Sequence, residues 1–185
     1  MKLNQIKSTL IIAITTLSLG ACNEKIPAPT TPPQNETELI TTVKLIFTDT
    51  ATNAVRTAYF YDIDGPGGAA PTVLDTIKLK SNTVYKTAIY LLDDSKNPAD
   101  SISNEVLKEG QDHLFVFTKV GINLNFQIAD KDINSLPIGL SSYWSTGAVS
   151  NGAVTVTLKH QPGVKDGTAA LGETDVEILF PCKIQ

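Results

Sequence analysis

The segment Gly121-Ile-Asn-Leu-Asn-Phe-Gln-Ile128 decides the fold class, because apolar and polar residues alternate along its whole length from Ile122. A period of two places successive side chains on opposite faces of an extended strand. Ile122, Leu124, Phe126 and Ile128 share one face, and amide side chains occupy the other. The segment therefore predicts a strand with one buried and one solvated face.

The same period begins at Leu39 and continues almost to the last residue. We expect strands at about 39–49, 55–61, 73–79, 85–91, 114–120, 122–128, 138–144, 154–158 and 176–184. One short helix is expected near residues 100–109, capped by Asp100 or Ser101 and ended by Gly110. This pattern predicts an all-β, immunoglobulin-like or Greek-key β-sandwich of about nine strands with one short helix, with a β-barrel as the alternative.

The first residues have the features of an export signal. Lys2 and Lys7 precede an apolar run that closes on Gly20 and Ala21, and Cys22 follows directly. This order is typical of a signal peptide, and the run is too short to span a membrane, which takes roughly 20 apolar residues. A cysteine at this position resembles the lipidation site of bacterial lipoproteins, which implies cleavage after residue 21 and lipid attachment at Cys22.

Three segments follow from this interpretation. Residues 1–21 are the signal peptide, residues 22–37 form a proline-rich tether, and residues 38–185 form the β domain. Glu24, close to the cysteine, resembles the acidic signal that sends some Bacteroidetes lipoproteins to the cell surface. We therefore expect a lipid-anchored protein of the bacterial outer membrane, on either its periplasmic or its surface leaflet.

Charge and cysteine content limit the possible partners. Removing residues 1–21 removes two lysines and no acid, which takes the formal net charge from −4 to −6. The chain has no basic patch of the kind that nucleic acid requires, so nucleic acid is excluded as a partner. With Cys22 lipidated, Cys182 has no disulfide partner and is expected to be a small buried apolar residue.

The sequence predicts no enzyme. It lacks Gly-x-Ser-x-Gly, His-Glu-x-x-His and Cys-x-x-Cys motifs, and His113 and His160 are its only histidines. His160 has the inward parity of its strand and is expected to be a rim residue.

Two acidic loops are candidate calcium ligands. Asp130, Asp132 and Asn134 place three side-chain oxygens at alternating positions, and Asp62 and Asp64 form a shorter version of the same pattern. Calcium takes six to eight oxygens, so the two loops would have to meet at one end of the sandwich. The alternative is that these residues only stabilise turns.

Two other residue sets are candidates for binding. Glu105, Glu109 and His113 recur every four residues and would line one face of a continuous helix, where they could hold a transition metal, although Gly110 is expected to end the helix first. Aromatic residues gather in two strands, where they could form a sugar-binding platform or a surface for a protein partner. They are Tyr59, Tyr61, Tyr143 and Trp144.

Several short segments resemble a family of small flavobacterial lipoproteins. They are Glu38–Val43, Tyr61–Gly68, Glu105–His113, Pro137–Leu140 and Asp175–Phe180. Members of that family often carry the label of a type 1 periplasmic binding fold, which implies two lobes of alternating strands and helices. The period of two predicts a β-sandwich instead.

The sequence therefore predicts a membrane-anchored, non-enzymatic β-sandwich lipoprotein that binds a small-molecule, glycan or protein partner. One alternative is a structural or adhesive surface protein. Another is a carbohydrate-binding lipoprotein of a glycan-uptake system.

Overall fold

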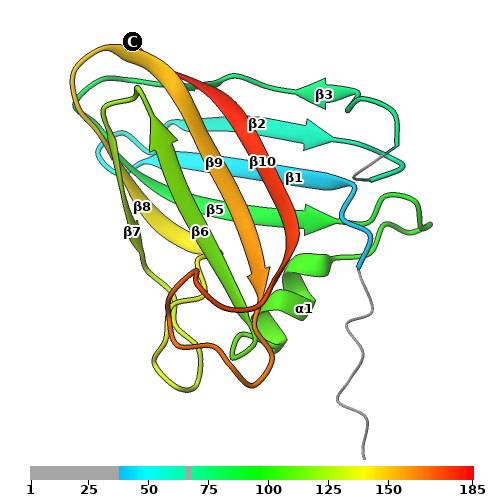
Figure 1. Ribbon diagram of the computed structural model, residues 1–185. Helices are drawn as coiled ribbons and strands as arrows, with labels where there is room; N and C mark the ends of the chain where they lie inside the picture. Colours follow the sequence, from blue (N-terminus) through cyan, green and yellow to red (C-terminus); the bar gives the residue numbers. More distant parts are fainter. Residues whose placement is uncertain (1–37, 66–67) are drawn as a thin grey trace, which may run out of the picture. The chain divides into compact units, whose positions relative to one another are not determined.

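Ten strands and one helix form within residues 38–65 and 68–185, the part of the chain that the computed structural model describes (Figure 1). The predicted signal peptide, the lipidation site Cys22 and the tether lie outside the described residues. The elements are β1 (Thr42–Asp49), β2 (Val55–Tyr61), β3 (Val73–Leu74), β4 (Ile77–Leu79), β5 (Val84–Leu92), α1 (Ile102–Lys108), β6 (His113–Val120), β7 (Leu124–Ile128), β8 (Ser141–Thr146), β9 (Ser150–His160) and β10 (Glu173–Ile184).

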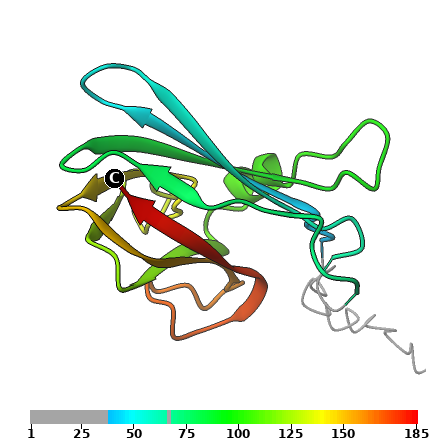
Figure 2. The same ribbon diagram turned by 90° about the horizontal axis from the view of Figure 1, so that it is seen from above.

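The strands form two sheets that lie one over the other, as the view from above shows (Figure 2). Sheet one has the order β3-β2-β1-β5-β8-β7, and all its neighbouring strands are antiparallel. Sheet two has the order β4-β10-β9-β6, in which only the pair of β4 and β10 is parallel. The predicted all-β sandwich is confirmed, and the described residues form neither a closed barrel nor two lobes of alternating strands and helices.

The alternating apolar side chains meet between the sheets. The largest fully buried side chains are Trp144, Tyr85, Phe47, Phe115 and Phe180. The Trp144 ring lies 5.1 Å from that of Phe47 and 4.7 Å from that of Phe126, both in edge-on geometry. Burial of aromatic area in such pairs is a main stabilising contribution to a core of this size.

The strand predicted over residues 73–79 is divided between the two sheets. Val73 and Leu74 pair with β2 in sheet one, whereas residues 77–79 pair with β10 in sheet two. Asp75 marks the crossing point, where its backbone N–H donates to the Tyr59 carbonyl and its carboxylate accepts the Tyr59 N–H. This division accounts for the tenth strand.

Helix α1 packs against the end of β5 through buried Ile102 and Val106. The Ser103 hydroxyl oxygen accepts the backbone N–H of Leu91 at 2.6 Å, which fixes the helix to that strand. The predicted cap is weaker than expected, because Ser101 occupies the N-cap position without a side-chain hydrogen bond. The helix ends at Lys108, so it stops before His113, and it leads the chain to the start of β6.

Candidate metal centre

Two histidines and one aspartate meet where β6 begins, β9 ends and β10 begins. His113 is the first residue of β6 and His160 the last residue of β9, and the two are direct partners in the antiparallel register. Direct partners project to the same face of a sheet, so their rings lie together. The ring centroids are 4.7 Å apart and the planes differ by 10°.

Asp175 reaches the same place through a β-bulge. The register between β10 and β9 shifts between Thr174 and Val176, which leaves Asp175 as the extra residue. A bulge turns a side chain away from the regular alternation. Asp175 Oδ2 consequently lies 4.0 Å from His113 Nε2, and its side chain is only 12% exposed.

The three residues lie close enough together to be candidate metal ligands. Ligand atoms of His113, His160 and Asp175 all lie within 4.8 Å of one another. His113 Nδ1 lies 3.1 Å from the Glu109 carbonyl oxygen, which can only accept a hydrogen bond, so Nδ1 carries the proton. Nε2 is thereby left unprotonated, as in metal sites whose ligating histidines are held by a second hydrogen bond.

Acidic side chains adjoin these three residues. Glu38 and Glu105 share a side-chain hydrogen bond, and Glu38 also interacts electrostatically with Glu109 and Asp175. Burial raises the pKa of Glu38 to about 8, and the neighbouring carboxylates act in the same direction. Glu38 therefore holds its proton at neutral pH, and a cation bound nearby would favour its ionised form.

The buried imidazole is held in the state that binds metals. Burial lowers the pKa of His113, an effect that the hydrogen bond with Glu109 opposes. The side chain is 5% exposed. At neutral pH it is therefore neutral, and metals bind the neutral imidazole.

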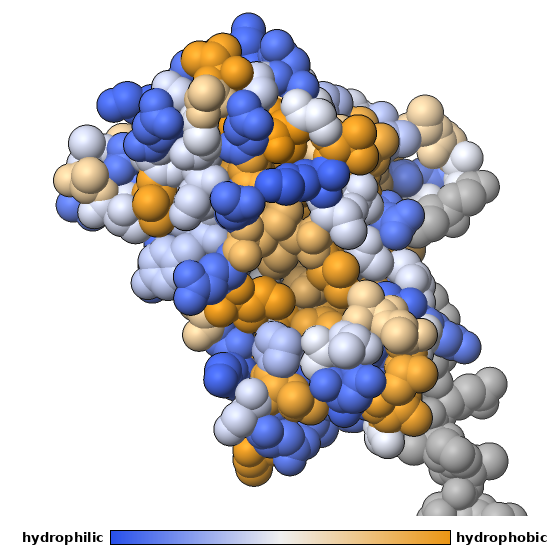
Figure 3. Space-filling model, turned by 60° about the vertical axis from the view of Figure 1, so that its left-hand side comes forward, coloured by the Kyte–Doolittle hydropathy of each residue, from blue (hydrophilic) through white to orange (hydrophobic). Residues whose placement is uncertain are grey.

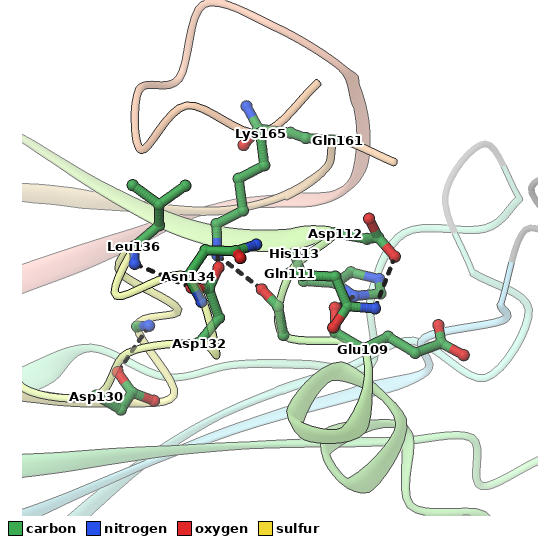
Figure 4. A network of polar contacts seen from close by, with 12 residues as sticks. Glu109, Gln111, Asp112, His113, Asp130, Asp132, Asn134, Leu136, Gln161 and Lys165 are labelled. Atoms are coloured by element: carbon green, nitrogen blue, oxygen red, sulfur yellow. Dashed lines mark hydrogen bonds and ion pairs between the residues drawn. The ribbon is translucent and has the colours of Figure 1, made fainter. Parts of the chain in front are cut away.

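A buried ion pair holds the loops beside this centre in place (Figure 4). Lys165 Nζ, in the loop between β9 and β10, donates to Asp132 Oδ2 at 2.8 Å and to the Gly110 carbonyl at 2.7 Å. The side chains of Lys165 and Asp132 are 2% and 1% exposed. One ammonium group thus joins the loops that precede β6, β8 and β10.

The first predicted calcium loop has a different role. The two carboxylate oxygens of Asp130 accept the backbone N–H groups of Gly139 and Ser141. Asp132 accepts the N–H groups of Asn134 and Leu136 besides the Lys165 ammonium. These carboxylates hold the loop together through hydrogen bonds and the ion pair with Lys165, which favours the alternative that they stabilise turns.

The second predicted calcium loop lies elsewhere. Asp62 and Asp64 hydrogen-bond to each other, and Asp64 accepts the Ala69 N–H at 2.9 Å. Burial and the hydrogen bond with Asp64 both raise the pKa of Asp62. The loop after β2 and the loop after β7 are well separated in Figure 1, so their oxygens do not converge on one cation.

The predicted stripe of Glu105, Glu109 and His113 is only partly recovered. The residues adjoin one another, but His113 lies on β6 and finds its ligand partners on β9 and β10. Sequence spacing missed Asp175 and the partnership with His160, because both depend on strand register. The inward parity of His160 was the one available signal.

The aromatic candidates do not form one surface. Trp144 is fully buried, so its prediction as a ligand-binding residue is wrong. Tyr143 is 39% exposed on β8, whereas half-buried Tyr59 and Tyr61 lie on β2, with β1 and β5 between those strands. Sequence reasoning also overlooked Tyr90, which is 46% exposed on β5.

Two other features adjoin the core. Cys182 is buried as expected, and burial raises the pKa of its thiol to about 11.

A groove of about 440 Å³ lies between the edge strands β6 and β7 and is lined by Phe115, Phe117 and Phe126 among others. The view that brings this side forward shows apolar side chains in a hollow with polar residues around it (Figure 3).

Comparison of the chain with protein families, with curated proteins and with solved structures found no match. Among the described residues, no helix has the length and apolar character needed to cross a membrane.

Proposed function

We propose that this chain is an exported lipoprotein, anchored through Cys22, whose β domain binds a divalent transition metal ion of the zinc class. The observation that carries the metal proposal is the convergence of His113, His160 and Asp175 from three strands, with ligand atoms within 4.8 Å of one another. The proposed role is binding rather than catalysis, in a bacterial outer membrane and in line with the resemblance to flavobacterial lipoproteins.

The donor set favours a transition metal over calcium. Two imidazole nitrogens and one carboxylate oxygen suit zinc and its neighbours, whereas calcium requires a shell of oxygens. Zinc–ligand bonds are about 2.0–2.1 Å long, which puts the ligand atoms of a tetrahedral site about 3.4 Å apart. Small side-chain rotations therefore suffice to close the site around an ion.

Calorimetric titration with zinc chloride tests the proposal. The protein is produced without residues 1–21 and with Cys22→Ser, because a free thiol would itself bind zinc. We expect one zinc ion per chain, and a loss of affinity of at least about 100-fold for His160→Ala and Asp175→Asn. The control is Glu177→Gln, which removes a charge from β10 outside the centre and should leave zinc affinity unchanged.

Thermal unfolding of each variant without metal separates loss of a ligand from loss of the fold. A parent protein that shows no saturable zinc binding would refute the proposed metal site. Equal zinc affinity in the parent and in His160→Ala would refute the ligand assignment.

A second candidate function is carbohydrate binding, and one observation favours it. Tyr59 and Tyr90 are both register partners of Lys44, on the outer face of sheet one. Exposed aromatic rings beside a hydrogen-bond donor are typical of sugar platforms. Glycan-array binding that disappears in Tyr90→Ala would support this function, and an array without signal would contradict it.

A further inference from the structure

The groove between the edge strands β6 and β7 has an apolar lining and a volume of about 440 Å³. At one end, loop residues Pro137 and Gly167 lie next to each other, since a Cβ added to Gly167 would lie 3.4 Å from Pro137 Cδ. The buried ion pair of Lys165 with Asp132 holds this end in place. From the two strands, the groove is lined chiefly by Phe115, Phe117, Phe126 and Ile128.

Aromatic rings from both sheets meet in the groove. Phe117 of β6 and Phe126 of β7 are half-buried, and their ring centroids are 5.4 Å apart. Each ring also packs against the buried Trp144, at 5.5 and 4.7 Å. Rings packed against a close-packed core have little freedom to rearrange, so the groove is formed before any ligand binds.

At the other end of the groove, Lys119 reaches across from β6 to β7. It lies two residues after Phe117, and its Nζ donates to the carbonyl of Leu124, two residues before Phe126. The same Nζ donates to Asn125 Oδ1 at 3.0 Å. Both acceptors are neutral, so these contacts do not compensate the positive charge. An ammonium group has three N–H donors, which leaves one for a ligand.

The groove is therefore apolar along its length and positively charged at one end, whereas the opposite end adjoins an acid, Asp166, next to Gly167 in the chain. We propose that it binds a single-chain fatty acid, with the carboxylate at Lys119 and the hydrocarbon chain directed toward Pro137. This function goes beyond metal binding and does not depend on it.

The dimensions of the groove fit one short acyl chain. Phe115 and Lys119 are four residues apart on β6, which corresponds to about 13 Å along a strand. An extended chain of about ten carbons, with C–C bonds of roughly 1.5 Å, covers a similar length. The volume of about 440 Å³ is in the lower part of the range typical of small-molecule sites. A phospholipid with two long chains would not fit.

An extended peptide fits the same place less well. β6 and β7 are both edge strands, and such edges can pair with an added strand. On β6, however, the Phe115 N–H already donates to the Ile138 carbonyl at 2.6 Å. Four residues further along, Lys119 crosses to β7. Little of the β6 edge remains for a ladder of hydrogen bonds, which favours a small amphiphile as the occupant.

Titration of the Cys22→Ser protein with decanoate tests the proposal. Calorimetry gives the affinity, and the fluorescence of Trp144, the only tryptophan, reports on the rings in the groove. We expect one decanoate per chain and a loss of affinity of at least about 10-fold for Lys119→Met and Lys119→Gln, whereas Lys119→Arg retains binding. The control is Lys183→Met, which removes a charge from an exposed position of β10 and should leave the affinity unchanged.

Decanol separates the role of the head group from that of the chain. It should bind the parent more weakly than decanoate does, and its affinity should be the same for the parent and Lys119→Met. Thermal unfolding of each variant without ligand shows whether the fold is kept. The proposal is wrong if decanoate does not bind saturably, or if Lys119→Met and Lys183→Met bind it equally well. It is also wrong if an alternating Val-Thr peptide or phosphatidylglycerol vesicles bind while decanoate does not.

Discussion

At the scale of single residues, the pair of Lys165 and Asp132 is the most consequential interaction outside the candidate metal centre. Both side chains are almost fully buried, and the Lys165 ammonium also donates to the Gly110 carbonyl. Removing one member of a buried pair leaves the other charge without compensation, which costs much more than removing both. Neither residue stands out in the sequence as a partner of the other, because 33 positions separate them.

We expect Asp132→Asn to lower the free energy of unfolding by about 3–5 kcal/mol, because it leaves the Lys165 ammonium without its carboxylate. The double variant Asp132→Asn, Lys165→Met should recover a large part of that loss. Urea unfolding of the parent and both variants measures the difference. A double variant as unstable as the single one would contradict this account.

The same pair predicts a loss of stability in acid. Burial tends to raise the pKa of Asp132, but the hydrogen bonds from Lys165 and the Leu136 N–H outweigh it and hold the pKa below the ordinary 3.8. As the pH falls, the unfolded chain takes up this proton before the folded one. The stabilisation is therefore present above about pH 4 and is lost as the pH falls further.

Urea unfolding at about pH 6 and about pH 3 checks this expectation. The unfolding free energy of the parent minus that of the double variant should be smaller at the lower pH. An unchanged difference would show that Asp132 does not contribute to acid unfolding.

At the scale of elements, the loop that leads into β8 packs tightly against β6. Gly139 has a φ of +97°, and a Cβ added there would lie 2.6 Å from Phe115 Cβ. Its backbone N–H also donates to Asp130. This turn therefore requires both the positive φ and the missing side chain of glycine.

We predict that Gly139→Ala lowers the free energy of unfolding by about 2–4 kcal/mol, from backbone strain together with the clash against Phe115. Gly163→Ala is the matched control, since Gly163 has a φ of +69° but no atom within 4 Å of an added Cβ. It should cost only the strain, about 1–2 kcal/mol. Equal losses in urea unfolding would show that the contact with Phe115 is unimportant.

The elements also show how far sequence reasoning reaches. Alternation predicted the strands well, because whether a side chain faces inward or outward is a local property of the sequence. The strand expected at 122–128 is an example: residues 124–128 form β7, and Ile122 is buried just before it. Parity does not say which sheet a strand joins, so the crossing at Asp75 was missed. The candidate metal centre was missed for a similar reason, since the pairing of His113 with His160 and the bulge at Asp175 depend on register between distant strands.

At the scale of the whole molecule, one aromatic cluster spans the space between the two sheets. Trp144 of sheet one contacts Phe47 and Phe126 of the same sheet and Phe117 of sheet two, at ring distances of 5.1, 4.7 and 5.5 Å. It is the only tryptophan of the chain. Its fluorescence therefore reports directly on the packing between the sheets.

We expect Trp144→Ala to lower the free energy of unfolding by about 3–5 kcal/mol, a large part of the stability of a domain of this size. Tyr143→Ala, one position along β8 on the exposed face, should change it by less than about 1 kcal/mol. Urea unfolding followed by circular dichroism compares the two. Similar losses would contradict the central role of Trp144.

The position of β10 has a consequence for the order of events as the chain emerges during synthesis. β10 pairs with β4 on one side and β9 on the other, and both of those strands precede it in the sequence. Until residues 173–184 are available, β4 has no partner in sheet two and the core side chains under β10 are uncovered. Sheet two therefore cannot be completed before β10 emerges, and in that interval the apolar surface is open to aggregation or to chaperones.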